Sequence, residues 1–215
     1  MAGRDERRDA MVREQLEARG VTDARVLDAF ASVPRDRFVT APDLAAAYED
    51  HPLPIGAGQT ISQPYVVALM VEALRVQATD RVLEVGAGSG YAAAILSCLA
   101  ADVVAVERMP GLAAAAAARL AELGYANVRV VAGDGSIGVA DAEPFDAICV
   151  SASAPRVPRA LVAQLAPGGR LVVPVGSPDE QQLVRVRVLE SGRVRTKRLG
   201  AVRFVPLVGE GGWQA

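Results

Sequence analysis

Apolar and polar positions alternate along this chain in blocks that predict strands followed by helices. Short apolar runs predict strands over 81–85, 102–107, 127–131, 145–150 and 169–175. Helical spacing of apolar residues predicts helices over 64–74, 90–100, 110–123 and 156–166. Strands and helices that alternate in this way form parallel sheets through right-handed βαβ crossovers.

The two ends of the chain follow other patterns. Residues 1–50 have apolar residues at roughly helical spacing and predict a small helical cap, with Thr22–Asp23 before its second segment. Residues 50–63 are rich in proline and glycine and predict a loop. The period changes to two over 183–189, which predicts an antiparallel strand. The last apolar run, 202–208, contains a proline and is confined to a sheet edge or a chain terminus.

These elements predict an α/β fold, with a mainly parallel sheet, antiparallel C-terminal strands and an N-terminal helical cap. At 215 residues the chain is large enough for one domain. We expect a single domain over 1–215, divided into a helical cap (1–50), a ligand-binding core (51–176) and C-terminal strands (177–215).

Composition narrows the classes of partner and of site. The net charge of −2 gives no sign of a nucleic-acid-binding surface, and no apolar run is long enough to span a membrane. Cys98 and Cys149 lie in apolar surroundings without metal-like spacing, which predicts buried free thiols in the cytoplasm. His51 is the only histidine, so we expect neither a histidine-based triad nor a metal site. We also expect a monomer.

A glycine-rich turn after the strand at 81–85 is the most informative motif. Gly86, Gly88 and Gly90 allow the backbone to turn sharply and to approach a ligand closely. Tyr91 stands where a dinucleotide fingerprint has its third glycine, and the acid Glu84 lies inside the strand. This arrangement resembles motif I of the S-adenosylmethionine-dependent methyltransferases, which have a Rossmann-like fold. Glycine turns also occur in α/β proteins that bind no nucleotide.

Two further acids follow later strands of the same alternation. Glu107 ends the run at 102–107, where a carboxylate can accept hydrogen bonds from both ribose hydroxyls. Asp134 lies in a Gly-Asp-Gly turn after the next strand, where it can meet an adenine amino group. Each of these acids could be a solvated residue at a strand end, but three in order predict a cofactor site.

Further segments resemble the protein-L-isoaspartate O-methyltransferases. Asp50 to Tyr65, which reads Asp-His-Pro-Leu-Pro-Ile-Gly-Ala-Gly-Gln-Thr-Ile-Ser-Gln-Pro-Tyr, is similar to the family's specific signature. The resemblance continues at 33–39 (Val-Pro-Arg-Asp-Arg-Phe-Val), 133–135, 167–176 and 203–207 and so covers nearly the whole chain. The chain differs slightly at 150–155, Val-Ser-Ala-Ser-Ala-Pro, where family members often carry threonine and a run of alanines.

The resemblance implies methyl transfer from S-adenosylmethionine to the free carboxyl of L-isoaspartyl residues, or to the equivalent group of D-aspartyl residues. The ester then closes to a succinimide, whose hydrolysis restores some normal aspartyl linkage, so the partners are isoaspartyl-containing proteins and peptides. An alternative within the methyltransferases is a biosynthetic relative that esterifies one aspartate of a partner peptide. A non-catalytic nucleotide-binding protein is disfavoured because Gln59 to Pro64 is intact.

The resemblance also implies site residues. The expected cofactor-binding residues are Gln59, Thr60, Ile61, Ser62, Glu84, Gly86, Gly88, Gly90, Glu107, Arg108, Leu112, Asp134 and Gly135. Those expected on the substrate side are Ile55, Ala152, Val205, Leu207 and Val208.

Ser62 is the candidate catalytic residue. A carboxylate nucleophile with a pKa near 4 is ionised at neutral pH and needs no general base, so the task is alignment. The Ser62 hydroxyl would hold the substrate carboxylate in line. Ser62 also precedes Pro64, so its side chain could cap the following helix, and the two roles can coexist.

Overall fold

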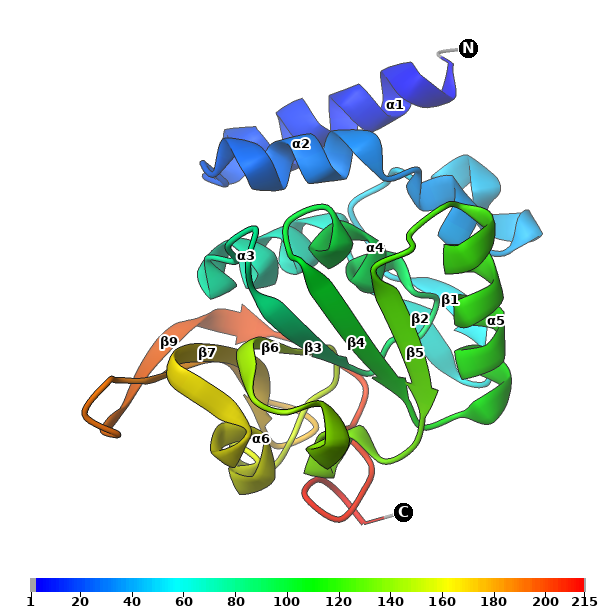
Figure 1. Cartoon of the computed structure of the whole chain (residues 1–215). Helices are drawn as coiled ribbons and strands as arrows, with labels where there is room; N and C mark the ends of the chain where they lie inside the picture. The colour runs from blue at the N-terminus through cyan, green and yellow to red at the C-terminus, as the bar shows by residue number, and fades with distance from the viewer. Residues whose placement is uncertain (1–2, 215) are drawn as a thin grey trace.

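The computed structural model describes residues 3–214, which form a twisted sheet with helices on both faces (Figure 1). The seven-stranded sheet has the order β5-β4-β3-β6-β7-β8-β9. Its strands are β3 (Arg81–Val85), β4 (Asp102–Glu107), β5 (Val128–Ala132), β6 (Phe145–Val150), β7 (Leu165–Gly176), β8 (Gln181–Val188) and β9 (Val194–Val202). Strands β3 to β7 pair in parallel, and β8 and β9 pair antiparallel, which confirms the predicted fold class.

The helices are α1 (Arg4–Ala10), α2 (Ala24–Ser32), α3 (Pro64–Leu74), α4 (Tyr91–Ser97), α5 (Pro110–Glu122) and α6 (Arg159–Ala163). Helices α1 and α2 lie over α3 and α4, whereas α6 lies on the opposite face of the sheet (Figure 1). Alternate residues of each central strand enter different clusters: Val82 packs on the α3 side and Leu83 on the α6 side. Burial on both faces explains why these strands read as continuous apolar runs.

The order in which the chain connects the strands determines where the site lies. From β3 the chain proceeds outward to β4 and β5, and it then returns to place β6 on the other side of β3. Such a reversal opens a crevice at the carboxyl ends of the strands, where α/β proteins bind ligands. Gly86, Ser151 and the end of β4 meet at this crevice because Val85 is in register with both Val106 and Val150.

The segment predicted as a loop at 50–63 contains a hairpin, β1 (Leu53–Gly56) and β2 (Gln59–Ile61). Leu53 pairs with Ile61, and both side chains are buried. The turn between them contains Ala57 and Gly58, both with positive φ. The loop prediction was wrong because two short strands with a proline carry little local periodicity, and tertiary burial of their apolar ends decides the conformation.

The structure corrects the predicted bounds of two helices, and it contains one strand that was not predicted. Helix α6 covers only Arg159–Ala163 rather than 156–166, because Leu165 already pairs with Phe145 and begins β7. Helix α4 likewise ends at Ser97 rather than at residue 100. Strand β9, at one edge of the sheet, was not predicted. The run 202–208, expected at a sheet edge or a terminus, begins with the last residue of β9 and continues toward the C-terminus, where it makes only isolated bridges such as Ser153 to Pro206. Strand β9 escaped prediction because its central residues 195–198 are four consecutive exposed polar residues, which leave no alternation of apolar and polar positions.

The N-terminal helical cap was predicted correctly, whereas the burial of the two cysteines was predicted correctly for only one of them. Residues 4–46 are mostly helical, as predicted, and Asp23 caps α2 by accepting a hydrogen bond from the backbone N–H of Arg25. Cys149 is buried, but Cys98 is exposed at the end of α4, which corrects the prediction of two buried thiols. Among residues 3–214, no helix is long and apolar enough to cross a bilayer.

Candidate active site

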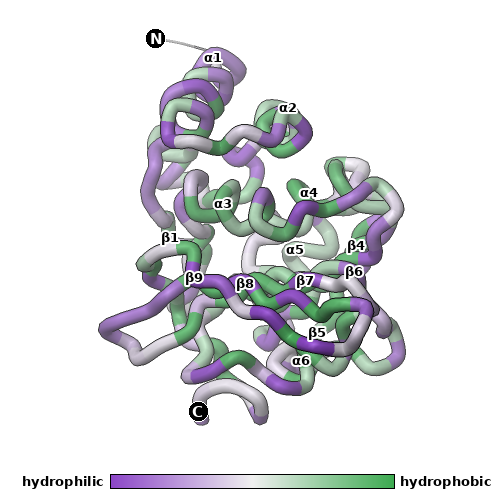
Figure 2. The backbone as a smooth tube through the Cα atoms, turned by 90° about the vertical axis from the view of Figure 1, so that its left-hand side faces the viewer, coloured by the Kyte–Doolittle hydropathy of each residue, from purple (hydrophilic) through white to green (hydrophobic). Residues whose placement is uncertain are grey.

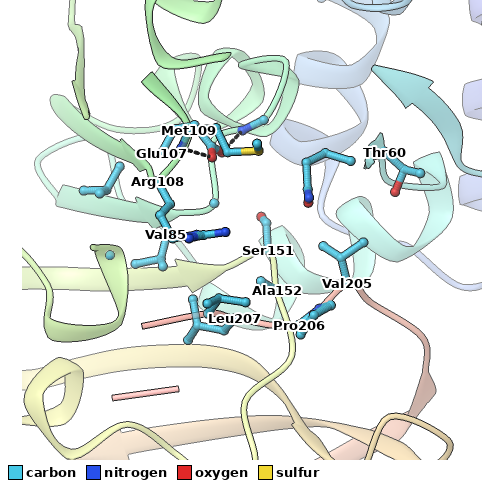
Figure 3. A pocket seen from close by; sticks show the side chains of 16 residues that line it. Thr60, Val85, Glu107, Arg108, Met109, Ser151, Ala152, Val205, Pro206 and Leu207 are labelled. Atoms are coloured by element: carbon cyan, nitrogen blue, oxygen red, sulfur yellow. Dashed lines mark hydrogen bonds between the residues drawn. The ribbon is translucent and has the colours of Figure 1, made fainter. Parts of the chain in front are cut away.

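Three adjoining pockets open at the carboxyl edge of the parallel strands, and all three share Thr60 and Ser151. We name each pocket by one charged residue of its lining: the Glu107 pocket, the Glu84 pocket and the Arg203 pocket. In Figure 3 the Ser151 side chain lies in the centre of the Glu107 pocket, with Glu107 and Met109 across from the segment Val205–Leu207.

The structure brings most of the predicted residues to these pockets. The Glu107 pocket is lined by Gln59, Thr60, Gly86, Gly88, Glu107, Arg108, Gly135, Ala152, Val205, Leu207 and Val208, among others. The Glu84 pocket is lined by Thr60, Ile61, Ser62, Glu84, Gly86 and Gly88, among others. Of the residues expected on the substrate side, only Val205 also lines the Arg203 pocket, together with Ser62 and Thr60.

The glycines of the turn serve different contacts. A Cβ on Gly88 would lie 3.1 Å from Cδ1 of Ile55, so the β1–β2 hairpin packs directly over the glycine turn. Gly90 lines none of the three pockets, and a Cβ there would lie 3.1 Å from Cδ1 of Leu120 in helix α5. Gly86 and Gly88 therefore border the crevice, whereas Gly90 allows the turn to pack against a helix.

Glu107 ends β4 with a buried carboxylate that organises the glycine turn. One oxygen, Oε2, accepts a hydrogen bond from the backbone N–H of Gly88 at 2.9 Å. The other, Oε1, accepts one from the backbone N–H of Met109 at 2.9 Å, and both bonds are drawn in Figure 3. Because a carboxylate oxygen can accept more than one hydrogen bond, Glu107 can still receive ligand hydroxyls from the pocket that it lines.

Glu84 is buried in β3 with one oxygen unpartnered. Its side chain is 1% exposed, and Oε1 accepts a hydrogen bond from the Ser151 hydroxyl at 3.3 Å. Oε2 has no hydrogen-bond partner among residues 3–214. Burial raises the pKa of Glu84 to about 8, against the opposing hydrogen bond from Ser151. An orphaned acid of this kind fits a ligand that brings a positive group into the pocket, as S-adenosylmethionine would.

A pH dependence of stability follows from the raised pKa of Glu84. In the folded protein without ligand, Glu84 keeps its proton up to about pH 8, whereas the unfolded chain releases it near 4.5. The wild-type protein should therefore lose stability relative to Glu84→Gln as pH rises from 5 to 8, by on the order of a few kcal/mol, and the difference should level off above pH 8. Urea unfolding of both proteins at several pH values measures this. Parallel stability curves would show that Glu84 is ionised in the fold.

Ser62 lies between β2 and α3 and lines both the Glu84 and the Arg203 pockets. Its hydroxyl makes no capping bond to α3 within the described chain. The N-cap residue is Gln63, whose side chain makes no capping bond to the helix either. Asp50 instead accepts a hydrogen bond from the backbone N–H of Tyr65 at 3.1 Å and another from Nε2 of Gln63 at 2.7 Å. The capping role considered for Ser62 thus falls to Asp50, and the Ser62 hydroxyl lies at the junction of two pockets.

Arg35 was not predicted as a functional residue, although it lies in the segment 33–39. Its side chain is fully buried and donates hydrogen bonds to the carbonyls of Ala47, His51 and Ser62. These carbonyls lie on both sides of the β1–β2 hairpin in the sequence. Arg35 therefore holds the base of the hairpin that covers the glycine turn.

Asp134, Leu112, Gly90 and Ile55 do not line the three pockets. The Asp134 carboxylate accepts hydrogen bonds from the Ser136 hydroxyl at 2.6 Å and from the backbone N–H of Glu210 at 2.8 Å. It thereby ties the C-terminal segment to the turn after β5, while its neighbour Gly135 lines the Glu107 pocket.

Sequence reasoning also missed Ser151, which lines all three pockets and contacts Glu84. The available signal was its position directly after β6, equivalent to that of Gly86 after β3. Met109 and Phe204 were missed as well, because nothing in their local sequence distinguishes them from core residues.

The chain matches known proteins over almost its whole length. The model of the family described as protein-L-isoaspartate(D-aspartate) O-methyltransferase (PCMT) matches residues 6–212. Protein-L-isoaspartate O-methyltransferase 2 of Marinobacter nauticus is 54% identical over 207 residues, which cover 96% of this chain and 94% of that protein. The protein-L-isoaspartate O-methyltransferase of Rhodopseudomonas palustris is 56% identical over 205 residues, which cover 95% and 94% of the two chains.

Solved structures agree with the sequence comparisons. A protein-L-isoaspartate O-methyltransferase superimposes with a TM-score of 0.85 at 30% identity, over 95% of this chain and 67% of that one. A Plasmodium falciparum protein assigned to the same activity, in complex with S-adenosyl-L-homocysteine, has a TM-score of 0.80 at 25% identity, over 94% and 98% of the two chains. The chain therefore belongs to the protein-L-isoaspartate (D-aspartate) O-methyltransferase family.

Proposed function

We infer that this protein transfers the methyl group of S-adenosylmethionine to the free carboxyl of L-isoaspartyl residues in damaged proteins. The observation that carries this inference is family membership over residues 6–212, together with pockets that fit both a cofactor and an acceptor. The ester closes to a succinimide, and hydrolysis returns part of it to normal aspartyl linkage. Relatives above 50% identity are named for the isoaspartyl activity, which favours repair over a dedicated biosynthetic role. We propose D-aspartyl residues as second acceptors.

We propose that the cofactor occupies the Glu107 and Glu84 pockets. When bound, S-adenosylmethionine supplies a methyl group activated by a positively charged sulfur. Glu107 would accept hydrogen bonds from the ribose, and Arg108 and Gly135 would border the adenosine. Glu84 would face the methionine part, where its unpartnered oxygen offers an acceptor for a cation. The hairpin residues Gln59, Thr60 and Ile61 would cover the ligand and exclude water.

The pocket linings also change which of the residues expected on the substrate side would contact the peptide. Ala152, Leu207 and Val208 lie on the Glu107 pocket, so we propose that they contact the cofactor rather than the peptide. The peptide would occupy the Arg203 pocket, whose lining includes Phe204, Val205 and Ser62.

For the chemical step, the protein then needs only to hold the acceptor carboxylate in position. The isoaspartyl carboxylate, with a pKa near 4, is already ionised, and catalysis is alignment of its oxygen with the methyl group. Ser62 and Ser151 both line the Glu84 and Arg203 pockets. The Ser151 hydroxyl already donates its proton to Glu84, so Ser62 is the hydroxyl that can donate a hydrogen bond to the acceptor. His51 is partly exposed and bonded to Glu49 and to the Pro52 carbonyl, and no base is required of it.

The proposed function is tested with two peptides that differ only in one linkage. We expect rapid formation of methyl ester on an isoaspartyl peptide with S-adenosylmethionine, and essentially none on the matched aspartyl peptide, because the normal linkage presents a side-chain carboxyl on a differently placed backbone. Labelled methyl transfer followed by mass spectrometry measures both. Equal ester formation on the two peptides, or formation on neither, would reject the repair function.

We further propose that the chain acts as one domain, as a monomer and in the cytoplasm. The helical cap and the sheet share one hydrophobic cluster, which supports a single domain. Charged residues along the edge strand β9 disfavour edge-to-edge pairing, which supports a monomer. Cys98 and Cys149 are free thiols, which is typical of proteins in a reducing compartment.

A further inference from the structure

Positive charge is concentrated at one edge of the sheet. Residues 191–209 contain Arg193, Arg195, Lys197, Arg198 and Arg203 and no acid, although the whole chain has a net charge of −2. Figure 2 views the molecule from the β9 side, where β9 is coloured largely purple for hydrophilic residues. We call these five residues, with Arg185 and Arg187 of the neighbouring strand β8, the β9 cationic edge.

The cations of this edge oppose one another across the two strands. In the antiparallel register, Arg187 is paired with Arg195, and Arg185 is paired with Lys197. Like charges directly opposite each other destabilise a sheet. Within residues 3–214, none of the seven side chains forms an ion pair. Protection of an edge strand against aggregation needs charge, but it does not need like charges on two adjacent strands.

The β9 cationic edge leads to the site of the proposed acceptor. The C-terminal end of β9, residues 201–202, lines the Arg203 pocket next to Thr60, Ser62 and Ser151. Arg203 follows directly and is the only charged side chain in that lining. A peptide seated there would thus have cations beside its reacting residue and along the strand that leads away from it.

We propose that the β9 cationic edge binds acidic side chains that flank the isoaspartyl residue, so that the enzyme selects damaged sites within acidic segments. This inference rests on the proposed function and adds a substrate class to it. Exposed ion pairs are individually weak and change affinity by about two- to fivefold each, and salt screens them. Several together should produce roughly a tenfold preference at low ionic strength.

The test uses three isoaspartyl peptides that are identical except for their flanking residues, which are glutamate, glutamine or lysine. We expect kcat/KM to fall in that order, by roughly tenfold from the glutamate to the lysine peptide, with the difference in KM rather than in kcat. Added salt at about 0.5 M should largely remove the ranking, because the Debye length falls below about 5 Å. Equal kcat/KM for the three peptides at low salt would overturn the proposal.

Variants of the β9 cationic edge test whether this surface produces the preference for acidic flanking residues. Arg203→Gln, and the double variant Arg195→Gln with Lys197→Gln, should each bring the ratio of the glutamate to the glutamine peptide closer to one. Arg129→Gln, an exposed arginine on β5 at the other edge of the sheet, is the matched control and should retain the wild-type ratio. A ratio that is unchanged in the edge variants would overturn the assignment.

Failure of the acidic preference and failure of the proposed function give different results with these peptides. If none of the peptides is methylated, the neutral one included, the proposed function itself fails. If a 20-nucleotide single-stranded DNA inhibits methylation while the peptides show no ranking, the β9 cationic edge binds nucleic acid and the proposal is overturned. A methylated neutral peptide without any ranking rejects only the acidic preference.

Discussion

Replacing Glu107 with alanine is expected to weaken S-adenosylmethionine binding by about 100-fold or more. The proposed ribose contact contributes two charge-assisted hydrogen bonds, each about 1.5–3 kcal/mol, and a total near 3 kcal/mol already corresponds to about 100-fold. The same carboxylate accepts hydrogen bonds from the backbone N–H groups of Gly88 and Met109, so its loss also frees the glycine turn. Calorimetric titration with S-adenosylmethionine or its demethylated product measures the change.

Two further variants separate charge from fold in this experiment. Glu107→Gln retains one amide oxygen and should fall between the wild type and Glu107→Ala. Asp141→Ala removes an exposed acid outside the pockets and should bind the cofactor as the wild type does. Unchanged cofactor affinity in a folded Glu107→Ala protein would show that Glu107 organises the turn but does not contact the cofactor.

Ser62→Ala is expected to lower kcat/KM for an isoaspartyl peptide by roughly ten- to several-hundred-fold. The change removes one hydrogen bond to a charged group and part of the alignment of the acceptor oxygen. The melting temperature should change little, because Asp50 rather than Ser62 caps helix α3. Ser62 also lines the Glu84 pocket, where we propose that the cofactor binds, so calorimetry measures any change in cofactor affinity separately. Kinetics at saturating S-adenosylmethionine and thermal unfolding on the same preparation then distinguish the effect on alignment from effects on binding and stability.

Asp50→Ala serves as the comparison, because it should lower the stability of the protein rather than its turnover. Asp50 accepts hydrogen bonds from Arg19, Gln63 and the backbone N–H of Tyr65, so its removal should cost about 1 kcal/mol of stability or more. Ser191→Ala, in the exposed turn before β9, controls for the loss of a serine hydroxyl and should be neutral. Near-wild-type turnover of Ser62→Ala would remove Ser62 from the catalytic assignment.

Local sequence was sufficient for the central α/β framework. The bounds of β3, β4, β6 and α3 were predicted to the residue, since apolar runs and proline or glycine boundaries are local signals. The glycine turn was located for the same reason. Strand β9 and the β1–β2 hairpin escaped because neither carries a periodic pattern of its own, and pairing with distant segments determines them.

The sequence by itself determined which residue types stand at the carboxyl ends of the strands, and hence that Glu84 and Glu107 would lie near a glycine turn. Only the tertiary structure decided how each acid is used. Glu84 meets Ser151, 67 residues away. Asp134 holds the backbone of Glu210, 76 residues away, and does not line the three pockets of the site. Likewise Asp50, not Ser62, caps α3. A hydrogen bond depends on the distance and angle between groups, and for segments far apart in sequence the packing of the whole fold determines both.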